Sequence, residues 1–329
     1  MAQRMKGRVF LVDETQSLRR AALVVDGRLE ALEVDRLDDT GPRWGAVYRA
    51  KIVERMTAMG AAFVDLGGDR GFLPDAGDAL PGAVLTVQVR REAEGDKAAR
   101  VSTDIQVEHR LVVHTPTKPG INVSKKITER DERDVLRDAL DGLKGGFVIR
   151  TAAEGMMADE LREIAKSLSL PYQRDAGLLR EGPDALARLE LLHEGAPIED
   201  DFELLDIDTQ IDALQSPRVD LTEGAWMTIE PTTALVAIDV NTGKARGGDA
   251  LQRVNLAAAA EIPRQLRLRH LGGAIAVDFA GGPKGKARAR LEKAIGSSLP
   301  PLGWGPAGWM ELQTRKPGRT LADLLEGTR

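Results

Sequence analysis

Two aspartates close two short apolar segments of the chain. Segment 234–239 ends on Asp239, and segment 274–278 ends on Asp278. Apolar runs of this length predict strands that are buried on both faces, with each carboxylate at the carboxyl end of its strand. Two close carboxylates repel unless a cation or a proton lies between them, and all-oxygen ligands favour Mg²⁺ or Mn²⁺. Each aspartate can instead simply cap the following turn, but Asn241 nearby favours the metal-binding interpretation.

The stretch between the two aspartates predicts the helix that brings them together. Strand, helix and strand in this order form a right-handed crossover unit with parallel strands. Neighbouring strands lie about 4.8 Å apart, so Asp239 and Asp278 are expected to converge at the edge where open α/β sheets bind ligands. The helical spacing is carried by Leu251, Val254, Ala258, Ile262, Leu266 and Leu268.

The net charge of −5 conceals an asymmetry along the chain. Residues 241–329 carry 15 Lys and Arg against 7 Asp and Glu, whereas residues 1–240 carry 31 against 44. A basic region attracts polyanions, so Lys284 and Lys286, with Arg288 and Arg290, are candidate phosphate-binding residues directly after the second aspartate. The alternative is an ordinary solvated helix face.

Residues 40–104 change to short apolar runs that glycines interrupt. About five closely spaced strands with glycine at the bends predict a small closed barrel of the oligonucleotide-binding type. Phe63 and Phe72, with Lys97 and other cations nearby, offer the stacking surface and charge that single strands need. The alternative is that both aromatic side chains belong to the barrel core.

The run 147–151 predicts a strand that ends on Arg150 and Thr151. Arginine binds oxyanions through two parallel hydrogen bonds, and threonine adds a hydroxyl donor, so the pair suits a phosphate. The alternative is that Arg150 pairs with a nearby glutamate.

Composition limits the remaining possibilities. A chain of 329 residues has room for two or three domains. No apolar stretch approaches the roughly 20 residues of a membrane span, and the first residues lack a signal-peptide core, so a cytoplasmic location is expected. The absence of cysteine excludes disulfides and thiolate metal sites, and the four histidines show no zinc-ligand spacing.

The order of these features resembles the ribonuclease E/G family, the bacterial single-strand endoribonucleases, over nearly the full chain. Residues 45–103 are similar to the family's S1 domain, with 61–65 and 71–74 as its marks, and 148–151 is similar to its motif for the 5′-phosphate of RNA. The strongest likeness lies in 237–241, Arg246-Gly247-Gly248-Asp249, Asn255-Leu256, 264–269, 271–273 and Val277-Asp278-Phe279.

The resemblance implies roles for particular residues. Asp239 and Asp278 would be the Mg²⁺ ligands, with Mn²⁺ able to substitute, and Asn241 would assist one of them. In the family, the metal activates a water that attacks the phosphodiester and leaves a 5′-phosphate on the downstream product, which agrees with the chemistry of a metal-bound water. The implied RNA contacts are Phe63, Phe72 and Lys97 of the S1 domain, and Arg150 and Thr151 of the 5′-end sensor.

The resemblance also implies an α/β, multi-domain architecture. A ribonuclease-H-like domain would comprise 1–39 and 105–220, with a shortened 5′-sensor region, and the S1 barrel at 40–104 would be inserted into it. An α/β metal-dependent catalytic domain would follow at 221–329. Longer members continue with a cysteine pair that shares zinc between subunits. The lack of cysteine here excludes a zinc-linked tetramer of this chain and leaves a homodimer open.

These features predict a Mg²⁺-dependent endoribonuclease that cleaves single-stranded RNA in RNA processing or decay. A catalytically silent RNA-binding protein of the same fold is the alternative, but such a protein has no need of Asp239, Asp278 and Asn241 beside a basic region. A DNA-directed phosphodiesterase is disfavoured by the S1-like barrel, although stacking alone does not separate RNA from DNA.

Overall fold

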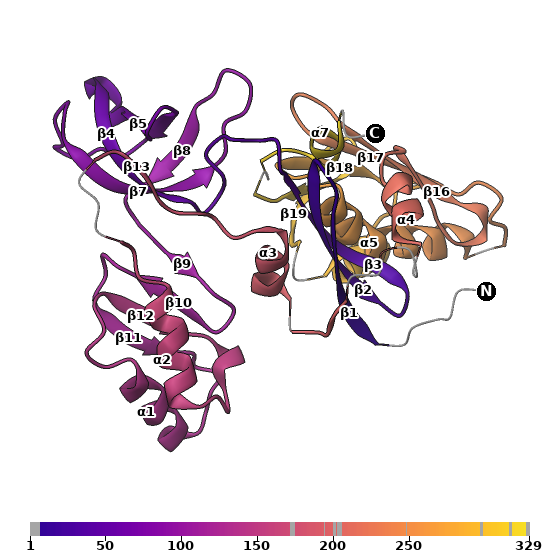
Figure 1. The fold of residues 1–329 in the computed structure, drawn as a ribbon. Helices are drawn as coiled ribbons and strands as arrows, with labels where there is room; N and C mark the ends of the chain where they lie inside the picture. Colours follow the sequence, from indigo (N-terminus) through magenta and orange to yellow (C-terminus); the bar gives the residue numbers. More distant parts are fainter. Residues whose placement is uncertain are drawn as a thin grey trace. The chain divides into compact units, whose positions relative to one another are not determined.

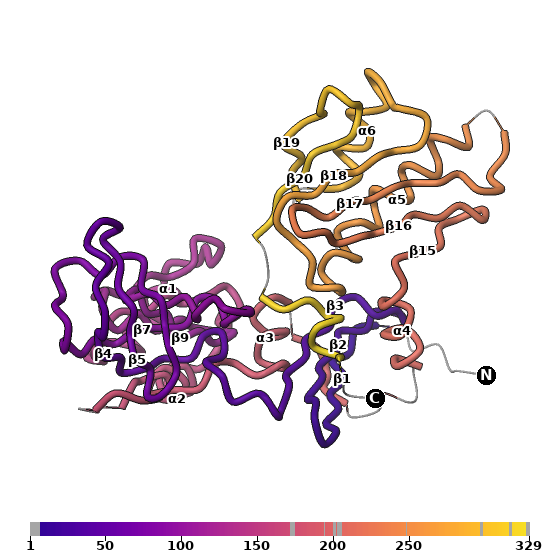
Figure 2. The backbone as a smooth tube through the Cα atoms, turned by 90° about the horizontal axis from the view of Figure 1, so that it is seen from above, coloured from indigo at the N-terminus to yellow at the C-terminus, as the bar shows by residue number. Residues whose placement is uncertain are grey.

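A computed structural model describes residues 7–171, 175–193, 195–199, 202, 206–247, 249–296, 299–315 and 318–326. The described chain is mixed α/β, with four sheets and two compact units (Figures 1 and 2). Unit 1 comprises Met1–Arg36 and Pro197–Arg329, and unit 2 comprises Leu37–Ala196. The predicted division into ribonuclease-H-like, S1 and catalytic domains stays a prediction.

Unit 2 contains a closed barrel of five strands, as predicted. Antiparallel pairing of the first and fourth strands closes the barrel, and alternate apolar residues of the strands fill its interior. β13 (Gly177–Arg180) pairs with the first barrel strand from outside. The barrel strands are β4 (Val47–Met56), β5 (Ala61–Asp65), β6 (Arg70–Leu73), β7 (Val84–Arg91) and β8 (Ala99–Ser102).

A second sheet of unit 2 has helices packed against it. Leu136 of the first helix and Leu161 of the second share one core with Phe147 of the sheet. The first helix has acidic residues in its first turn and Arg137 in its last, which suits the helix dipole. The strands are β9 (Val107–Glu108), β10 (Val112–Thr115), β11 (Gly120–Val123) and β12 (Gly146–Ile149); the helices are α1 (Arg130–Ala139), α2 (Ala158–Ser167) and the separate α3 (Ala185–Leu192), with short turns η1 (Thr57–Met59) and η2 (Thr151–Ala153).

Unit 1 begins with an antiparallel meander of three strands. Asp26 and Gly27 turn between the second and third strands, both with positive φ, as a two-residue hairpin requires. The elements are β1 (Arg8–Glu14), β2 (Leu18–Val25) and β3 (Arg28–Arg36), with β14 (Ile198–Glu199) parallel to β1, and helices α4 (Ile207–Ala213) and α7 (Leu321–Leu325) pack into the same core.

The larger sheet of unit 1 has six strands in the order β15-β16-β17-β18-β20-β19. β17 and β18 are parallel and are joined by α5, whereas the other neighbours are antiparallel. The elements are β15 (Arg218–Asp220), η3 (Thr222–Gly224), β16 (Trp226–Pro231), β17 (Val236–Asn241), α5 (Ala250–Leu268), β18 (Ala274–Asp278), α6 (Lys286–Ile295), β19 (Pro301–Trp304) and β20 (Met310–Gln313). Among the residues that the structure describes, no helix is both long and apolar enough to span a membrane.

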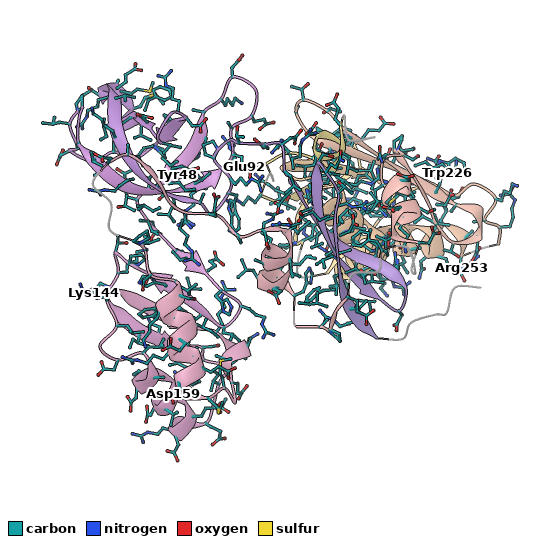
Figure 3. All side chains as sticks on the ribbon, viewed as in Figure 1. Tyr48, Glu92, Lys144, Asp159, Trp226 and Arg253 are labelled. Atoms are coloured by element: carbon teal, nitrogen blue, oxygen red, sulfur yellow. The ribbon has the colours of Figure 1, made fainter. Side chains whose placement is uncertain are left out.

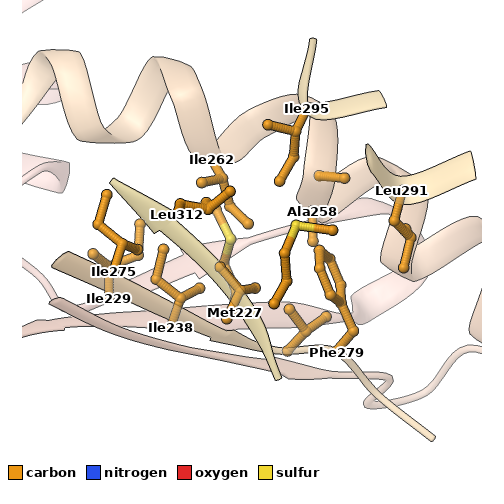
Figure 4. Packing of buried hydrophobic residues seen from close by; sticks show 14 of the residues in the cluster. Met227, Ile229, Ile238, Ala258, Ile262, Ile275, Phe279, Leu291, Ile295 and Leu312 are labelled. Atoms are coloured by element: carbon orange, nitrogen blue, oxygen red, sulfur yellow. The ribbon is translucent and has the colours of Figure 1, made fainter. Parts of the chain in front are cut away.

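Only one face of this sheet is buried. Ile238 and Ile275 of the central strands pack against Ala258 and Ile262 of α5 (Figure 4). Along β17 and β18, buried residues alternate with exposed or half-buried ones. The prediction that both faces are buried is therefore wrong: small alanines on the second face made each run look uniformly apolar. We call this second face, which carries Asp239 and Asp278, the open face.

Candidate active site

The two aspartates lie next to each other on the open face. β17 and β18 are neighbours, and their register makes Asp239 the direct partner of Asp278. Both residues are exposed. Because partner residues of parallel strands point to the same face of the sheet, the two carboxylates lie side by side in solvent. The register thus produces the predicted convergence of the two residues.

Asn241 lies on the same face, two residues after Asp239. Its Nδ2 donates a hydrogen bond to Asp239 Oδ2 over 2.6 Å. This bond fixes one oxygen of Asp239 and leaves the other available. In the described part of the chain, no Lys, Arg or His forms an ion pair with Asp239 or Asp278. The negative charge of the pair is therefore not neutralised by a neighbouring side chain.

This donor set suits an oxygen-seeking divalent cation. No third Asp, Glu or His joins the pair in a metal-binding group among the described residues. Mg²⁺ is commonly held by one or two carboxylates and completes its shell with waters and substrate phosphates. Two carboxylates such as Asp239 and Asp278 match the protein share of such a shell, and their chemistry does not suit a softer metal.

Asn255 fixes the chain just beyond Asp278. Its Nδ2 donates to Ala280 O over 2.9 Å, and its Oδ1 accepts from Ala280 N over 3.0 Å. Asn255 is only 4% exposed, so its side chain meets Ala280 from inside the fold. This positioning residue carries no assigned role in the sequence analysis. Its signal was a polar side chain among the apolar positions of α5, next to Val254.

The basic segment 284–290, which runs from the loop after β18 into α6, contains two kinds of cation. Arg288 lies over the Trp304 ring, 4.5 Å from its centroid, and donates to Pro283 O. Arg290 Nη1 donates to Gln252 Oε1 over 3.0 Å. In contrast, Lys284 and Lys286 are exposed and form no ion pair within the described residues. The two lysines are therefore the cations of this segment that are available to a phosphate.

An ion pair holds the loop that follows Asn241. The guanidinium of Arg253 on α5 donates to both carboxylate oxygens of Glu223, each over 2.8 Å, and also to Arg246 O. The hydrogen bond from Arg253 lowers the pKa of Glu223 below its ordinary value. Figure 3 labels Arg253 and Trp226, which lie on elements that flank this loop. Sequence reasoning missed this pair because its members are 30 residues apart.

Phe63 and Phe72 lie on the outside of the barrel. They are cross-strand partners, with ring centroids 5.6 Å apart and planes tilted by 59°. Both are half-buried, while their strand neighbours fill the core. Arg70 lies 3.7 Å above the Phe63 ring and pairs with Glu54 over 2.7 Å. Lys97 is exposed in the turn between β7 and β8. The pair is therefore an outer-face aromatic surface with cations beside it.

Arg150 and Thr151 already have protein partners. Arg150 Nη2 pairs with Glu108 Oε2 over 2.6 Å, with the two side chains 30% and 26% exposed. Thr151 Oγ1 and Ser124 Oγ share a hydrogen bond of 2.8 Å. Arg150 thus pairs with a glutamate, as in the alternative, but its partner lies 42 residues away in the sequence rather than close by. A phosphate at this point has to compete with Glu108 for the guanidinium.

The structure sorts the predicted residues into two groups. Unit 1 contains Asp239, Asn241, Asp278, Lys284 and Lys286, of which the first three meet on the open face. Unit 2 contains Phe63, Phe72, Lys97, Arg150 and Thr151.

Comparison with known proteins places the chain in a family. A family model described as the ribonuclease E/G family matches residues 106–177 and 176–300. Ribonuclease G of Salmonella typhimurium (strain SL1344) is 28% identical over 96% of this chain and 81% of the relative. Ribonuclease G of Escherichia coli (strain K12) is 28% identical over 82% of this chain and 70% of the relative. Ribonuclease E of the same strain is 29% identical over 82% of this chain but only 32% of the relative. The chain therefore belongs to the ribonuclease E/G family.

Proposed function

We propose that this protein is a Mg²⁺-dependent endoribonuclease that cleaves single-stranded RNA. The observation that carries the proposal is the pair Asp239 and Asp278, adjacent and exposed on the open face, with Asn241 bonded to one of them. Membership of a family whose relatives are named ribonucleases supports RNA as the substrate.

The side chains divide the work of the reaction. Asp239 and Asp278 would hold Mg²⁺, or Mn²⁺ in its place, through carboxylate oxygens, and Asn241 keeps Asp239 oriented. When bound, the metal supplies an acidic water and neutralises charge on the phosphoryl oxygens. Without a cation the two carboxylates repel a phosphodiester, so RNA contacts the open face productively only when a divalent cation is present. Lys284 and Lys286 add positive charge next to the same strand end.

Unit 2 would provide the RNA-binding surface. Phe63 and Phe72 offer ring faces for unpaired bases, and Arg70 and Lys97 offer charge for the backbone. We assign residues 40–104 as an S1 domain on this basis, with the ribonuclease-H-like segments and the catalytic domain bounded as the resemblance implies. Arg150 and Thr151 would contact a 5′-phosphate weakly, because Glu108 already occupies the guanidinium.

The direct test is cleavage of an internally labelled single-stranded RNA under single-turnover conditions. The expected result is a set of internal cuts with Mg²⁺, none with EDTA, and downstream products that carry a 5′-phosphate. A DNA of the same sequence should remain intact. Binding of several RNAs without cutting, in Mg²⁺ and in Mn²⁺, would favour the catalytically silent RNA-binding protein, and equal cutting of the DNA would favour a general phosphodiesterase.

A further inference from the structure

Trp226 lies on the open face beside the aspartates. It is the cross-strand partner of Asn241. Its strand neighbour Met227 is buried in the core beneath the sheet, so alternation turns the indole to the opposite side. The side chain of Trp226 is half-buried. An aromatic surface therefore adjoins the residue that orients Asp239.

Trp309 lies on the other side of the pair. It directly precedes β20, whose first residue, Met310, is buried and pairs with Val277. Alternation along both strands therefore places Trp309 on the open face beside Asp278. Its side chain is 43% exposed. The hydrogen bond from Gly305 N to Trp309 O, 2.9 Å long, ties its backbone to the neighbouring chain.

A cation accompanies the first tryptophan. The guanidinium carbon of Arg218 lies 4.4 Å from the centre of the Trp226 ring. Arg218 Nε also donates to Asp220 Oδ1 over 2.8 Å, which steadies the side chain. The Arg218 side chain is otherwise well exposed to solvent. A planar cation stacked on an indole can support a base and also neutralise its phosphate.

The spacing of the two tryptophans suits a single strand. Trp226 is on β16 and Trp309 leads into β20, with β17 and β18 between them. Three steps between strands amount to about 14 Å. Stacked bases advance by about 3.4 Å per nucleotide, so at most about four nucleotides, and fewer in an extended strand, cover the distance. Asp239 and Asp278 lie within this interval.

We propose that Trp226 and Trp309 are stacking sites for nucleobases on either side of the scissile phosphate. The RNA would then cross the sheet strands, with one unpaired base on each indole and the cleaved bond over the aspartates. Stacking accepts any base but requires it to be unpaired. The catalytic sheet itself would thus select single strands. This inference rests on the proposed function and names how that site binds its substrate.

The substitutions have to separate stacking from packing. An added Cβ at Gly243 would lie 2.6 Å from Trp226 Cζ3, so the loop after β17 rests on this indole. Alanine would leave that loop unsupported, whereas leucine keeps apolar volume and removes the ring. The informative variants are therefore Trp226→Leu and Trp309→Leu, with Trp226→Phe and Trp309→Phe as conservative partners. Leu192→Ala, an exposed apolar residue of unit 2, is the matched control.

The first readout is single-turnover cleavage at sub-saturating protein. Each leucine variant should lose about tenfold to a hundredfold, as expected for one stacked base, while the phenylalanine variants and Leu192→Ala stay within about threefold. RNAs with one abasic nucleotide near the cleavage site provide the cross-check. One abasic position should slow cleavage by the wild type but cause no further loss in Trp226→Leu. A different abasic position should slow the wild type but cause no further loss in Trp309→Leu. Additive losses at every position, or fully active leucine variants, would overturn the stacking sites.

A second readout does not need cleavage. In the Asp239→Asn background, RNA that contains 5-iodouracil near the cleavage site is irradiated and the adducts are mapped by mass spectrometry. Adducts on Trp226 or Trp309 are expected. Adducts on these indoles with a wild type that never cuts would reject the nuclease and keep the stacking sites. Cutting without such adducts and without abasic coupling would reject the stacking sites and keep the nuclease.

Discussion

Charged residues that suit phosphate chemistry lie at two places in the sheets: Arg150 at one strand end, and Asp239 and Asp278 at two others. The charge of Arg150 is paired within the protein, whereas the charges of the aspartates are not. Arg150 pairs with Glu108, and Thr151 shares a hydrogen bond with Ser124. Among the described residues, the Asp239 carboxylate accepts a side-chain hydrogen bond from Asn241, and no cation pairs with Asp239 or Asp278. The first pair is satisfied without a ligand, whereas the second pair is left with like charges side by side.

A phosphate at Arg150 must compete with an existing ion pair, whereas a divalent cation at the aspartates relieves electrostatic repulsion. Like charges about 5 Å apart repel by about 1 kcal/mol in bulk water and by about 3 kcal/mol at the effective dielectric of a protein surface. A divalent cation removes that repulsion at the aspartates. A phosphate at Arg150 gains little, because it replaces an existing ion pair. In the proposed reaction Asp239 and Asp278 should therefore be essential, whereas Arg150 should only modulate the rate.

The largest expected effect is at the aspartates. Asp239→Asn and Asp278→Asn should each lower the single-turnover rate by about a thousandfold or more, because the loss of a metal ligand removes several kcal/mol of transition-state stabilisation. Folding stability should be unchanged or slightly higher, because one of two repelling charges is gone. The matched control is Glu230→Gln, an exposed carboxylate of the neighbouring strand, which should retain full activity. An active Asp278→Asn variant would remove that residue from the site.

The next effect concerns the buried support of the site. Asn255→Leu removes both hydrogen bonds to Ala280 and leaves two backbone groups without partners, at about 1–3 kcal/mol each. We expect a stability loss of about 2–4 kcal/mol in urea unfolding and a rate loss of about tenfold to a hundredfold, since a small displacement of a reacting group is costly. Arg267→Gln, an exposed residue in the last turn of the same helix, is the control. Normal cleavage by a folded Asn255→Leu variant would show that the loop needs no such clamp.

Glu261, a carboxylate with protein partners, should show the opposite behaviour from the aspartate pair in the pH dependence of stability. Burial raises the pKa of Glu261, but the bond from Gln265 and the charges of Arg264 and Arg28 outweigh it, so its pKa lies below the ordinary 4.5. A carboxylate whose pKa is lower in the folded than in the unfolded chain stabilises the fold. This stabilisation is complete at a pH above the unfolded-state pKa and is lost as the pH falls through the folded-state pKa. Glu261→Gln should cost about 1–3 kcal/mol at neutral pH and flatten the acid part of the stability curve. An unchanged acid limb would contradict this assignment.

The smallest effect is expected at Arg150. Arg150→Ala should abolish any preference for 5′-monophosphate over 5′-hydroxyl RNA, and Glu108→Gln, which releases the guanidinium, should strengthen that preference by about two- to tenfold. Neither change should alter cleavage of 5′-hydroxyl RNA by more than about twofold, since the reacting groups lie elsewhere. If neither the wild type nor Glu108→Gln distinguishes the two RNAs, the 5′-phosphate site does not exist.

Much of the fold was predictable because its signals are local. Apolar runs that end on Asp239 and Asp278, with a helical pattern between them, predicted β17, α5 and β18, and glycine-interrupted runs predicted the barrel. The open face was not predictable, because Ala237 and Ala276 on that side look as apolar as their buried neighbours.

Contacts between residues far apart in the chain could not be predicted from the sequence either. Glu108 lies 42 residues from Arg150, and nothing in either segment shows that they meet. Nothing in the sequence places Trp226 beside Asn241, because that pairing depends on strand register, which tertiary packing sets.

The most direct test compares the two strand ends in one experiment. Wild type, Asp239→Asn and Arg150→Ala are assayed at saturating protein for single-turnover cleavage of one 5′-hydroxyl single-stranded RNA in Mg²⁺. We predict that Arg150→Ala cuts within about twofold of the wild-type rate and that Asp239→Asn falls to the background seen with EDTA. An Asp239→Asn rate within tenfold of the wild type would contradict the assignment of the open face as the catalytic site.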